Sequence, residues 1–197
     1  QKWSYFMNTK GKNRSVQRTQ ALLKSGLTEL MMTKPVQNIT VRELTDYVNL
    51  NRGTFYLHYK DIQNLLENME NDMLDEFVEI TNSHQPQDMK GKPFPLICDL
   101  YKFLGKNAEF VKLVLVTNQE HNFKERLKEI IQKRCMNDWI EVFDKADSKL
   151  SEIYSSYVLS GCIGIIENWI QNGTRQSPEE LARYTEDIML NGLNILN

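Results

Sequence analysis

Apolar residues recur at a helical spacing along most of this chain. In the segment 14–33, Leu23, Leu27 and Leu30 follow one another at intervals of three or four residues, which places them on one face of a helix. Pro35 ends this first helix, because the residue before a proline disfavours helical backbone. Alternation of apolar and polar residues, the pattern of strands, is nearly absent. The pattern therefore predicts an all-α protein of about nine helices.

Residues that can cap helices place the expected boundaries. Thr40, with a glutamate three residues later, forms a capping box, and Asn51 and Asp61 are good N-cap residues. Ser177 precedes a proline, which favours a helix start there. The polar segment 83–95 contains three prolines and is the best candidate for a loop. The helices that we expect are 14–33, a short helix after Thr40, 51–59, 61–82, 95–106, 108–117, 121–146, 149–172 and 178–196.

Charge is distributed unevenly along the chain. Residues 1–60 contain ten lysines and arginines and three acidic residues, whereas residues 61–197 contain fourteen and twenty-three. The first part is therefore basic, at about +7, and the second part is acidic, at about −9. A basic head suggests a polyanionic partner such as nucleic acid, although an ordinary fluctuation of surface charge would look the same.

Several classes of function lack their usual residues. Cys98, Cys135 and Cys162 are widely spaced in apolar surroundings, which is typical of reduced thiols in a cytoplasmic protein. No metal-binding spacing such as CxxC or HExxH occurs, so we expect neither a metal nor a cofactor. No apolar run is long enough to cross a membrane. We see no nucleophile–base pair and no phosphate-binding glycine loop, so we do not expect an enzyme.

The segment 39–66 is the most informative, because two short helices joined by a tight turn are the outline of a helix-turn-helix. A recognition helix needs apolar anchors on one face and polar or basic side chains on the other. The expected anchors are Leu44, Val48, Phe55, Leu57 and Tyr59. The residues expected to face DNA are Asn51, Arg52, Gly53, Thr54, Tyr56, His58 and Lys60. Gly53 has no side chain, so the backbone can approach the groove closely.

The same segment resembles the N-terminal domain of the TetR family of bacterial regulators. The match runs without a gap over Thr-Val-Arg-Glu-Leu at 40–44, Arg-Gly-Thr-Phe-Tyr-Leu-His-Tyr at 52–59, Asp61 and Leu65-Leu66. The resemblance implies a DNA-binding head whose third helix enters the major groove, and an all-α body that binds an effector and dimerises through its last two helices. Ile62 stands where many members of the family have a polar or basic residue.

The resemblance also implies a role for each matching position. Phosphate contacts are implied for Thr40 and Tyr56, and backbone support for His58 and Lys60. The residues placed nearest to the bases are Arg42, Arg52 and Thr54. Residues 1–60 are thus expected to form the DNA-binding domain and residues 61–197 the effector-binding and dimerisation domain, with the helix 61–82 linking them. The basic residues Lys10, Lys12, Arg14 and Arg18 form either an arm that touches DNA or a frayed terminus.

The C-terminal part resembles one TetR-like subgroup, some members of which resemble the activator of the dihydroxyacetone kinase operon. This resemblance rests on Phe94-Pro95-Leu96, Tyr101, Tyr157 to Gly164, Trp169 and Ser177 to Leu181. Two glycines three residues apart would let another helix approach closely, in a dimer or within one chain. The residues expected at a dimer interface are Tyr157, Gly161, Gly164, Leu181, Tyr184 and Ile188.

An effector cavity is expected among the central helices, although aromatic residues at helical spacing are also typical of plain core. The candidate lining residues are Phe103, Phe110, Leu113, Val114, Trp139, Phe143 and Trp169. The leading hypothesis is a homodimeric repressor that binds a palindromic operator in double-stranded DNA and responds to a small-molecule effector of unknown identity. The alternative is a TetR-like regulator or coactivator that is controlled by a protein partner.

Overall fold

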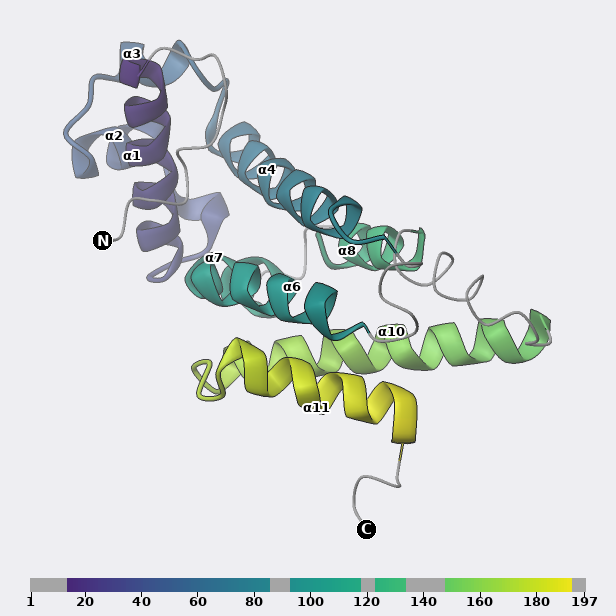
Figure 1. Cartoon of the computed structure of the whole chain (residues 1–197). Helices are drawn as coiled ribbons and strands as arrows, with labels where there is room; N and C mark the ends of the chain where they lie inside the picture. Colours follow the sequence, from purple (N-terminus) through teal and green to yellow (C-terminus); the bar gives the residue numbers. More distant parts are fainter. Residues whose placement is uncertain (1–13, 86–92, 118–122, 134–147, 193–197) are drawn as a thin grey trace. The chain divides into compact units, whose positions relative to one another are not determined.

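The computed structural model describes residues 14–85, 93–117, 123–133 and 148–192. Within these ranges the chain forms nine α-helices and no strand, which confirms the predicted all-α fold (Figure 1). The helices are α1 (Arg14–Met31), α2 (Val41–Tyr47), α3 (Arg52–Tyr56), α4 (Ile62–Asn82), α6 (Phe94–Lys106), α7 (Ala108–Val111), α8 (Phe123–Ile131), α10 (Ser148–Gln171) and α11 (Pro178–Asn191). A short 3₁₀ turn, η2 (Val36–Asn38), precedes α2, and a π-helical segment, η3 (Lys112–Thr117), follows α7.

The predicted N-caps are present. The side chain of Thr40 accepts a hydrogen bond from the backbone N–H of Glu43, with 3.2 Å between N and Oγ1. Asp61 caps α4 in the same way, and Ser177 caps α11 with Pro178 in the first turn. These side chains satisfy backbone donors that have no partner within the helix, which is why each helix begins where it does.

The chain divides into two compact units within α4, between Met73 and Leu74. The core of the first unit contains side chains from α1 to α4 that are fully buried, among them Leu23, Leu44 and Phe55. Gly26 of α1 lies against α2, and a Cβ atom added there would be 2.3 Å from Cγ1 of Val48. A glycine is therefore needed for α1 and α2 to approach this closely. The functional division predicted at residue 60 stays a prediction.

A partly buried ion pair connects α1 with the first part of α4. The ammonium of Lys24, on α1, binds the carboxylate of Asp72, on α4. Burial and the nearby carboxylate of Asp72 both raise the pKa of Tyr59, so this phenol stays neutral. Lys24 is buried and Asp72 is half exposed, so breaking the pair would remove a carboxylate from beside a buried ammonium.

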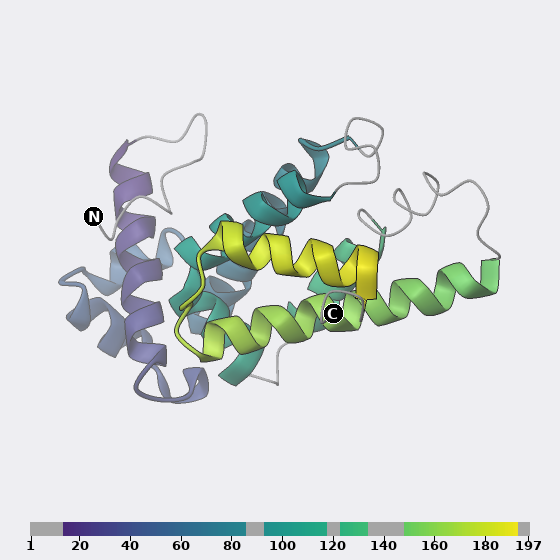
Figure 2. The same ribbon diagram turned by 60° about the horizontal axis from the view of Figure 1, so that its bottom comes forward.

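In the second unit α11 packs mainly on α6, and Figures 1 and 2 show α10 lying alongside α11. The hydroxyls of Tyr101 and Thr185 are 2.8 Å apart, and the carboxylate of Glu186 accepts a hydrogen bond from the N–H of Phe94. Trp169 of α10 meets the ring of Tyr101 edge-on at 5.6 Å between centroids. These contacts join α6, α10 and α11 into one core.

Two predicted helices differ from the observed ones. In place of the expected helix 108–117, the structure has the short helix α7 followed by the π-helical segment η3. A π-helix has more residues in each turn than an α-helix. In η3 the consecutive residues Leu113, Val114 and Leu115 are all buried. The expected helix 51–59 is regular only over α3. Of the expected helix 121–146, residues 121–122 and 134–146 lie outside the described part of the chain. None of the described helices combines the length and apolar character that a membrane span needs.

Candidate nucleic-acid interface

The recognition helix α3 begins at an exposed cap. Asn51 Oδ1 accepts a hydrogen bond of 2.7 Å from the backbone N–H of Gly53. A Cβ atom on residue 53 would lie 3.3 Å from that same oxygen, so the glycine gives the cap room. The predicted cap at Asn51 is therefore confirmed, and Gly53 also has a part in starting the helix. Their contact with DNA stays a prediction.

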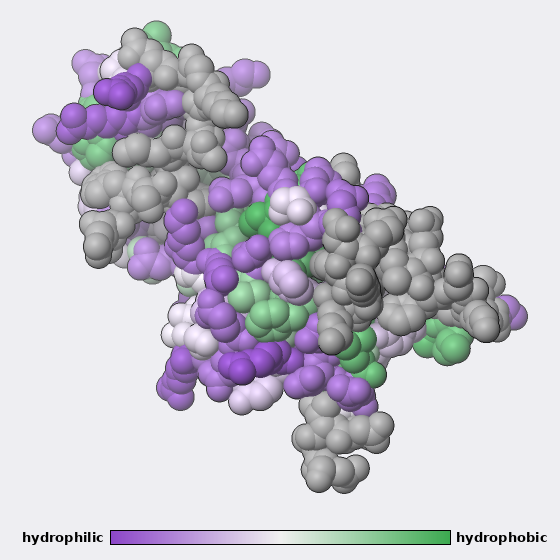
Figure 3. Space-filling model, in the orientation of Figure 1, coloured by the Kyte–Doolittle hydropathy of each residue, from purple (hydrophilic) through white to green (hydrophobic). Residues whose placement is uncertain are grey.

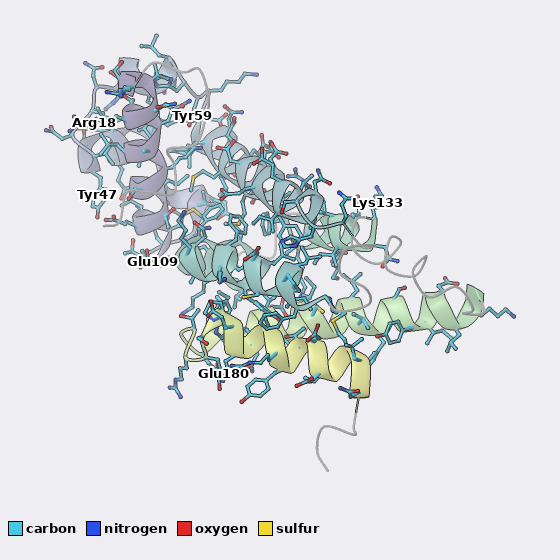
Figure 4. The ribbon with its side chains drawn as sticks, viewed as in Figure 1. Arg18, Tyr47, Tyr59, Glu109, Lys133 and Glu180 are labelled. Atoms are coloured by element: carbon cyan, nitrogen blue, oxygen red, sulfur yellow. The ribbon has the colours of Figure 1, made fainter. Side chains whose placement is uncertain are left out.

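Two buried aromatic rings hold α3 in place. Phe55 is fully buried, and its ring centroid is 5.9 Å from that of Tyr59, which is labelled in Figure 4. On α3 itself Arg52 is exposed and Tyr56 exposes 59% of its surface, and Lys60 after the helix is exposed as well. The helix thus has an anchored face and a free face, as a recognition helix requires.

Leu57 corrects one of the predicted anchors. It was expected to pack into the head, but it lies at the C-cap of α3 with 80% of its surface exposed. The reason is that Leu57 is two residues from both Phe55 and Tyr59, which places it on the opposite side of the helical turn from these two buried rings. An apolar side chain of this size, next to exposed polar ones, can contact sugar or thymine methyl groups in a DNA groove.

The remaining predicted DNA contacts differ in exposure. Thr40 and Arg42 are exposed at the start of α2, where Arg42 lies 3.6 Å from the carboxylate of Asp46. Thr54 and His58 are half-buried, so only part of each side chain is accessible. Ile62 is buried, so it packs in the core.

The proposed basic arm is described only in part. Arg14 and Arg18 are exposed at the N-terminal end of α1, and Arg18 is labelled in Figure 4. Lys10 and Lys12 lie outside the described residues.

The second unit contains an apolar cavity of about 600 Å³, including the open space at its mouth. Side chains from five helices line it, including Phe77 of α4, Leu100 and Tyr101 of α6, Ile131 of α8, Ile166 of α10 and Met189 of α11. Its walls are almost entirely apolar, as is common for small-molecule sites.

The lining residues predicted from the sequence are not the ones that line this cavity. Phe103, Phe110, Leu113, Val114 and Trp169 are all buried in the core of the second unit, and none of them faces the cavity. The indole N–H of Trp169 donates to the carbonyl of Gln176, and its ring lies against Gly105. Trp139 and Phe143 lie outside the described residues. No sequence signal separated the residues that line the cavity from the rest of the apolar core.

One face of α10 exposes apolar side chains. These residues recur every three or four positions and are Leu150, Ile153, Tyr154 and Tyr157. Figure 3 shows apolar surface, in green, at the N-terminal end of this helix. Gly161 and Gly164 continue the same stripe, and a Cβ added to either glycine would meet no described residue within 4 Å. Exposed apolar surface of this kind marks an interaction site.

The predicted interface residues on α11 differ in how far they are exposed. Tyr184 exposes about half of its surface, Ile188 is half-buried and Leu181 is buried. The hydroxyl of Tyr154 donates to the carbonyl of Met189 and so joins the exposed stripe of α10 to α11. The assignment of these residues to a dimer interface stays a prediction.

The described cysteines and acidic groups form no metal site. Cys98 is buried and Cys162 is half-buried, and both are free thiols. In the described ranges, no three His, Cys, Asp or Glu side chains are grouped closely enough to hold a metal ion.

Comparison with known proteins identifies relatives for most of the chain. A family profile for the C-terminal region of TetR-type transcriptional regulators matches residues 91–191, about half of the chain. YxbF of Bacillus subtilis, an uncharacterized HTH-type transcriptional regulator, is 23% identical over 167 residues. That match covers 83% of this chain and 43% of YxbF, so the chain spans less than half the length of this curated relative.

Solved structures share the fold at low sequence identity. The dihydroxyacetone kinase operon activator DhaS matches with a TM-score of 0.63 and 18% identity, over 90% of this chain and 97% of that one. NalD of Pseudomonas aeruginosa, the secondary repressor of the MexAB-OprM efflux pump, matches with a TM-score of 0.69 and 15% identity, over 91% and 98%. The profile, the relative and the shared fold agree with the helix-turn-helix described above, and the chain belongs to the TetR family of DNA-binding transcriptional regulators.

Proposed function

We propose that this protein is a homodimeric repressor that binds a palindromic DNA operator through α2 and α3 and releases it when a small molecule enters the second unit. The observation that carries the proposal is the two-sided recognition helix: Phe55 is buried without exposed surface, while Arg52 and Tyr56 are exposed. The residues proposed to contact DNA are Thr40, Arg42, Asn51, Arg52, Gly53, Thr54, Tyr56, His58 and Lys60, and Leu57 joins them.

The exposed stripe of α10 supports the homodimer. Apolar side chains of this size are costly to leave in water, at roughly 1.5–3 kcal/mol for each one that is fully buried instead. A second copy of the stripe would cover them, and the glycines would let the two helices approach closely. Two heads in one symmetric dimer read two half-sites about one turn of DNA apart.

The cavity supports a small-molecule effector over a protein partner. A regulator controlled by a protein partner would not need an apolar cavity inside its second unit. The helix α4 offers a path for coupling, because it carries Phe77 of the cavity wall and, nearer its start, Asp72 of the ion pair with Lys24. A ligand that displaces Phe77 would shift α4, and α4 is joined to α1 by the ion pair. Ligand-controlled release of DNA needs a coupling of this kind between the ligand site and the DNA-binding helices.

Selection of bound duplexes from a random library tests the proposal directly. The purified protein would be used at ~150 mM salt, where binding that rests on phosphates alone is weak. Enrichment of a two-fold-symmetric site is the expected result. A folded dimer that enriches no sequence would contradict the proposal, and a site without symmetry would contradict the homodimer.

Replacing Arg52 with alanine is expected to relax sequence preference at one base pair of each half-site, with a loss of about 1–3 kcal/mol there. The reason is that this exposed side chain stands at the first position of α3, where base edges are read. Binding is measured by fluorescence anisotropy on the selected operator and on single-base variants. Lys60→Ala is the matched control, because the loss of a phosphate contact should weaken binding equally on every operator variant. An equal loss on all sequences for Arg52→Ala would make it a phosphate contact instead.

Replacing Tyr56 with alanine is expected to weaken binding to every duplex, by roughly tenfold for one hydrogen bond to a charged phosphate. The hydroxyl is carried by a side chain that is largely exposed beside Arg52. Tyr47→Ala is the control, since Tyr47 is an exposed tyrosine of the same unit whose hydroxyl already donates to Glu29. Unchanged affinity for Tyr56→Ala, or an equal loss for Tyr47→Ala, would remove the assigned role.

A further inference from the structure

Leu57 is the most exposed of the large apolar side chains that the structure describes, with 80% of its surface accessible. The exposed apolar residues of α10 would be covered in the proposed dimer, whereas Leu57 lies in the first unit. A single leucine on a protein surface is common and indicates nothing by itself. Its position on the recognition helix, the charges around it and the chemistry of a DNA groove give this one a meaning.

The backbone places Leu57 one turn after Gly53. Leu57 follows the last residue of α3 and still has helical angles, with φ −69° and ψ −19°. Its N–H donates to the carbonyl of Gly53, with 3.2 Å between N and O, so the two residues share one side of the helix. Side chains of a helix lean towards its N-terminus, so Leu57 leans over the bare backbone at Gly53. No side chain at Gly53 holds this part of α3 away from a groove.

The turn that carries Leu57 is fixed from its buried side. Phe55 and Tyr59 each lie two residues from Leu57, so both are on the opposite side of the turn. Phe55 is fully buried and Tyr59 is 5% exposed, with 5.9 Å between the ring centroids. A turn that is anchored in this way is already in place before a partner binds, which favours a contact of defined position.

The charges around Leu57 suit nucleic acid. Residues 51–60 include no acidic residue, and their exposed charged side chains are those of Arg52 and Lys60. The nearest carboxylate in the sequence is that of Asp61, which caps α4. A leucine that stands in the sequence between two exposed cations fits a polyanion that also offers an apolar group.

The edges of base pairs in the major groove offer one such apolar group. It is the 5-methyl group of thymine, and the other groups that specify a base there are hydrogen-bond donors and acceptors. A leucine side chain makes no hydrogen bond, so thymine is the base that it can distinguish by contact.

Arg52 and Leu57 are far enough apart to read different bases. They stand at the start and just after the end of α3. Five residues of helix span roughly 7.5 Å along its axis. Successive base pairs are about 3.4 Å apart along DNA. We therefore expect the two side chains to meet different base pairs.

We propose that Leu57 is a specificity residue, which packs against the 5-methyl group of one thymine in each half-site of the operator, at a different base pair from the one that Arg52 reads. The inference rests on the proposed function, because it needs the operator that α2 and α3 are proposed to bind. It adds to that function the chemical identity of one base in the recognised sequence.

Replacing thymine with deoxyuridine tests the contact on the full-length protein, because this change removes the methyl group and keeps the hydrogen-bonding groups of the base pair. The probe is the duplex recovered by selection from the random library, with each thymine replaced in turn in both half-sites. At one position at least, affinity measured by fluorescence anisotropy should fall about fourfold for each methyl group, or about 15-fold for the symmetric pair. No loss at any thymine of the half-site would overturn the inference.

The variant Leu57→Ala assigns the methyl contact to this side chain. It should bind the thymine duplex more weakly than the unmodified protein, and the deoxyuridine change should then alter its affinity less than about twofold. Met32→Ala is the control, because it shortens another exposed apolar side chain of the first unit and should keep the full sensitivity to deoxyuridine. The melting temperature of Leu57→Ala should be unchanged, since the side chain is largely exposed. Unchanged affinity of Leu57→Ala, or sensitivity to deoxyuridine that persists in it, would overturn the assignment.

Repeating the library selection with the variants separates this inference from the proposed function. Leu57→Ala should enrich a symmetric site that has lost its preference for thymine at one position, whereas Arg52→Ala should lose a preference at another. Loss at the same position in both variants would contradict the separate base pairs. A symmetric site that does not change in Leu57→Ala contradicts the inference alone. An unmodified protein that enriches no symmetric site contradicts the proposed function and the inference with it.

Discussion

Replacing Gly26 with leucine is expected to abolish DNA binding by separating α1 from α2. A Cβ atom at residue 26 would lie 2.3 Å from Cγ1 of Val48 and 3.1 Å from Cδ1 of Leu44. Leu44 is fully buried and Val48 has a short branched side chain, so neither can move away freely. Overpacking of a core costs about 1–3 kcal/mol for a few added methylenes, and three further carbons beyond Cβ exceed what this contact can absorb. Because α2 supports α3, the loss extends to the recognition helix.

Hydrogen exchange and operator binding together measure this effect. Peptides from α1 and α2 should lose protection in Gly26→Leu, while peptides from α10 and α11 keep it, because the two compact units have separate cores. Operator affinity should fall by more than about a hundredfold, as expected for a loss of several kcal/mol in a small unit. Gly26→Ala provides the graded case, in which the clash is offset in part by about 1 kcal/mol of helix propensity. Normal protection and normal affinity in Gly26→Leu would show that α1 and α2 do not need this glycine.

The positions of most helices could be predicted because local signals decide them. Thr40, Asp61 and Ser177 each hold a backbone N–H with their own side chain, and such caps are visible in the sequence. The end of α10 has a similarly local cause, since Gly173 adopts a positive φ of 74° that favours glycine. Each of these features depends on a few neighbouring residues and not on the rest of the fold.

Features that depend on contacts between helices were not predicted. Gly26 looked like any glycine within a helical pattern, and only the approach of Val48 reveals its purpose. Leu57 is apolar like the other expected anchors of the recognition segment, yet it lies on the opposite side of the turn from Phe55 and Tyr59 and is exposed. The pattern of apolar residues predicts which side chains tend to be buried, but it does not predict the exact register at a helix end.

The cavity illustrates the same limit for the binding site. The aromatic residues that seemed the best candidates, such as Phe103 and Phe110, fill the core, and Trp169 packs against Gly105. The wall is made by Leu100, Ile166 and other aliphatic side chains instead. Whether an apolar side chain lines a space or fills one depends on how the helices pack, because composition is the same in both cases.

The second large effect is expected at the exposed stripe of α10, where Gly161→Leu should convert the dimer into a folded monomer. Within the described part of a single chain nothing lies within 4 Å of the added Cβ, so the substitution causes no clash with these residues. Replacement of a helical glycine should even stabilise the single chain, by about 0.5–1 kcal/mol. In a dimer that packs glycine against the partner helix, four added carbons would hold the helices apart. Light scattering should therefore give the mass of one chain, with helical content unchanged.

The test has a control on the same helix and a consequence for DNA. Ser156 is exposed on α10 beside the stripe, so Ser156→Leu adds a leucine to the same helix and should leave the dimer intact. The monomer formed by Gly161→Leu should bind a half-site only weakly, through its single DNA-binding head. It should also lose the strong preference for the full palindrome over one half-site, because only a dimer joins two heads. A normal dimer in Gly161→Leu would place the interface elsewhere. Loss of the dimer in both variants would show that the contact extends to the flank of α10 and does not depend on the close approach at the glycines.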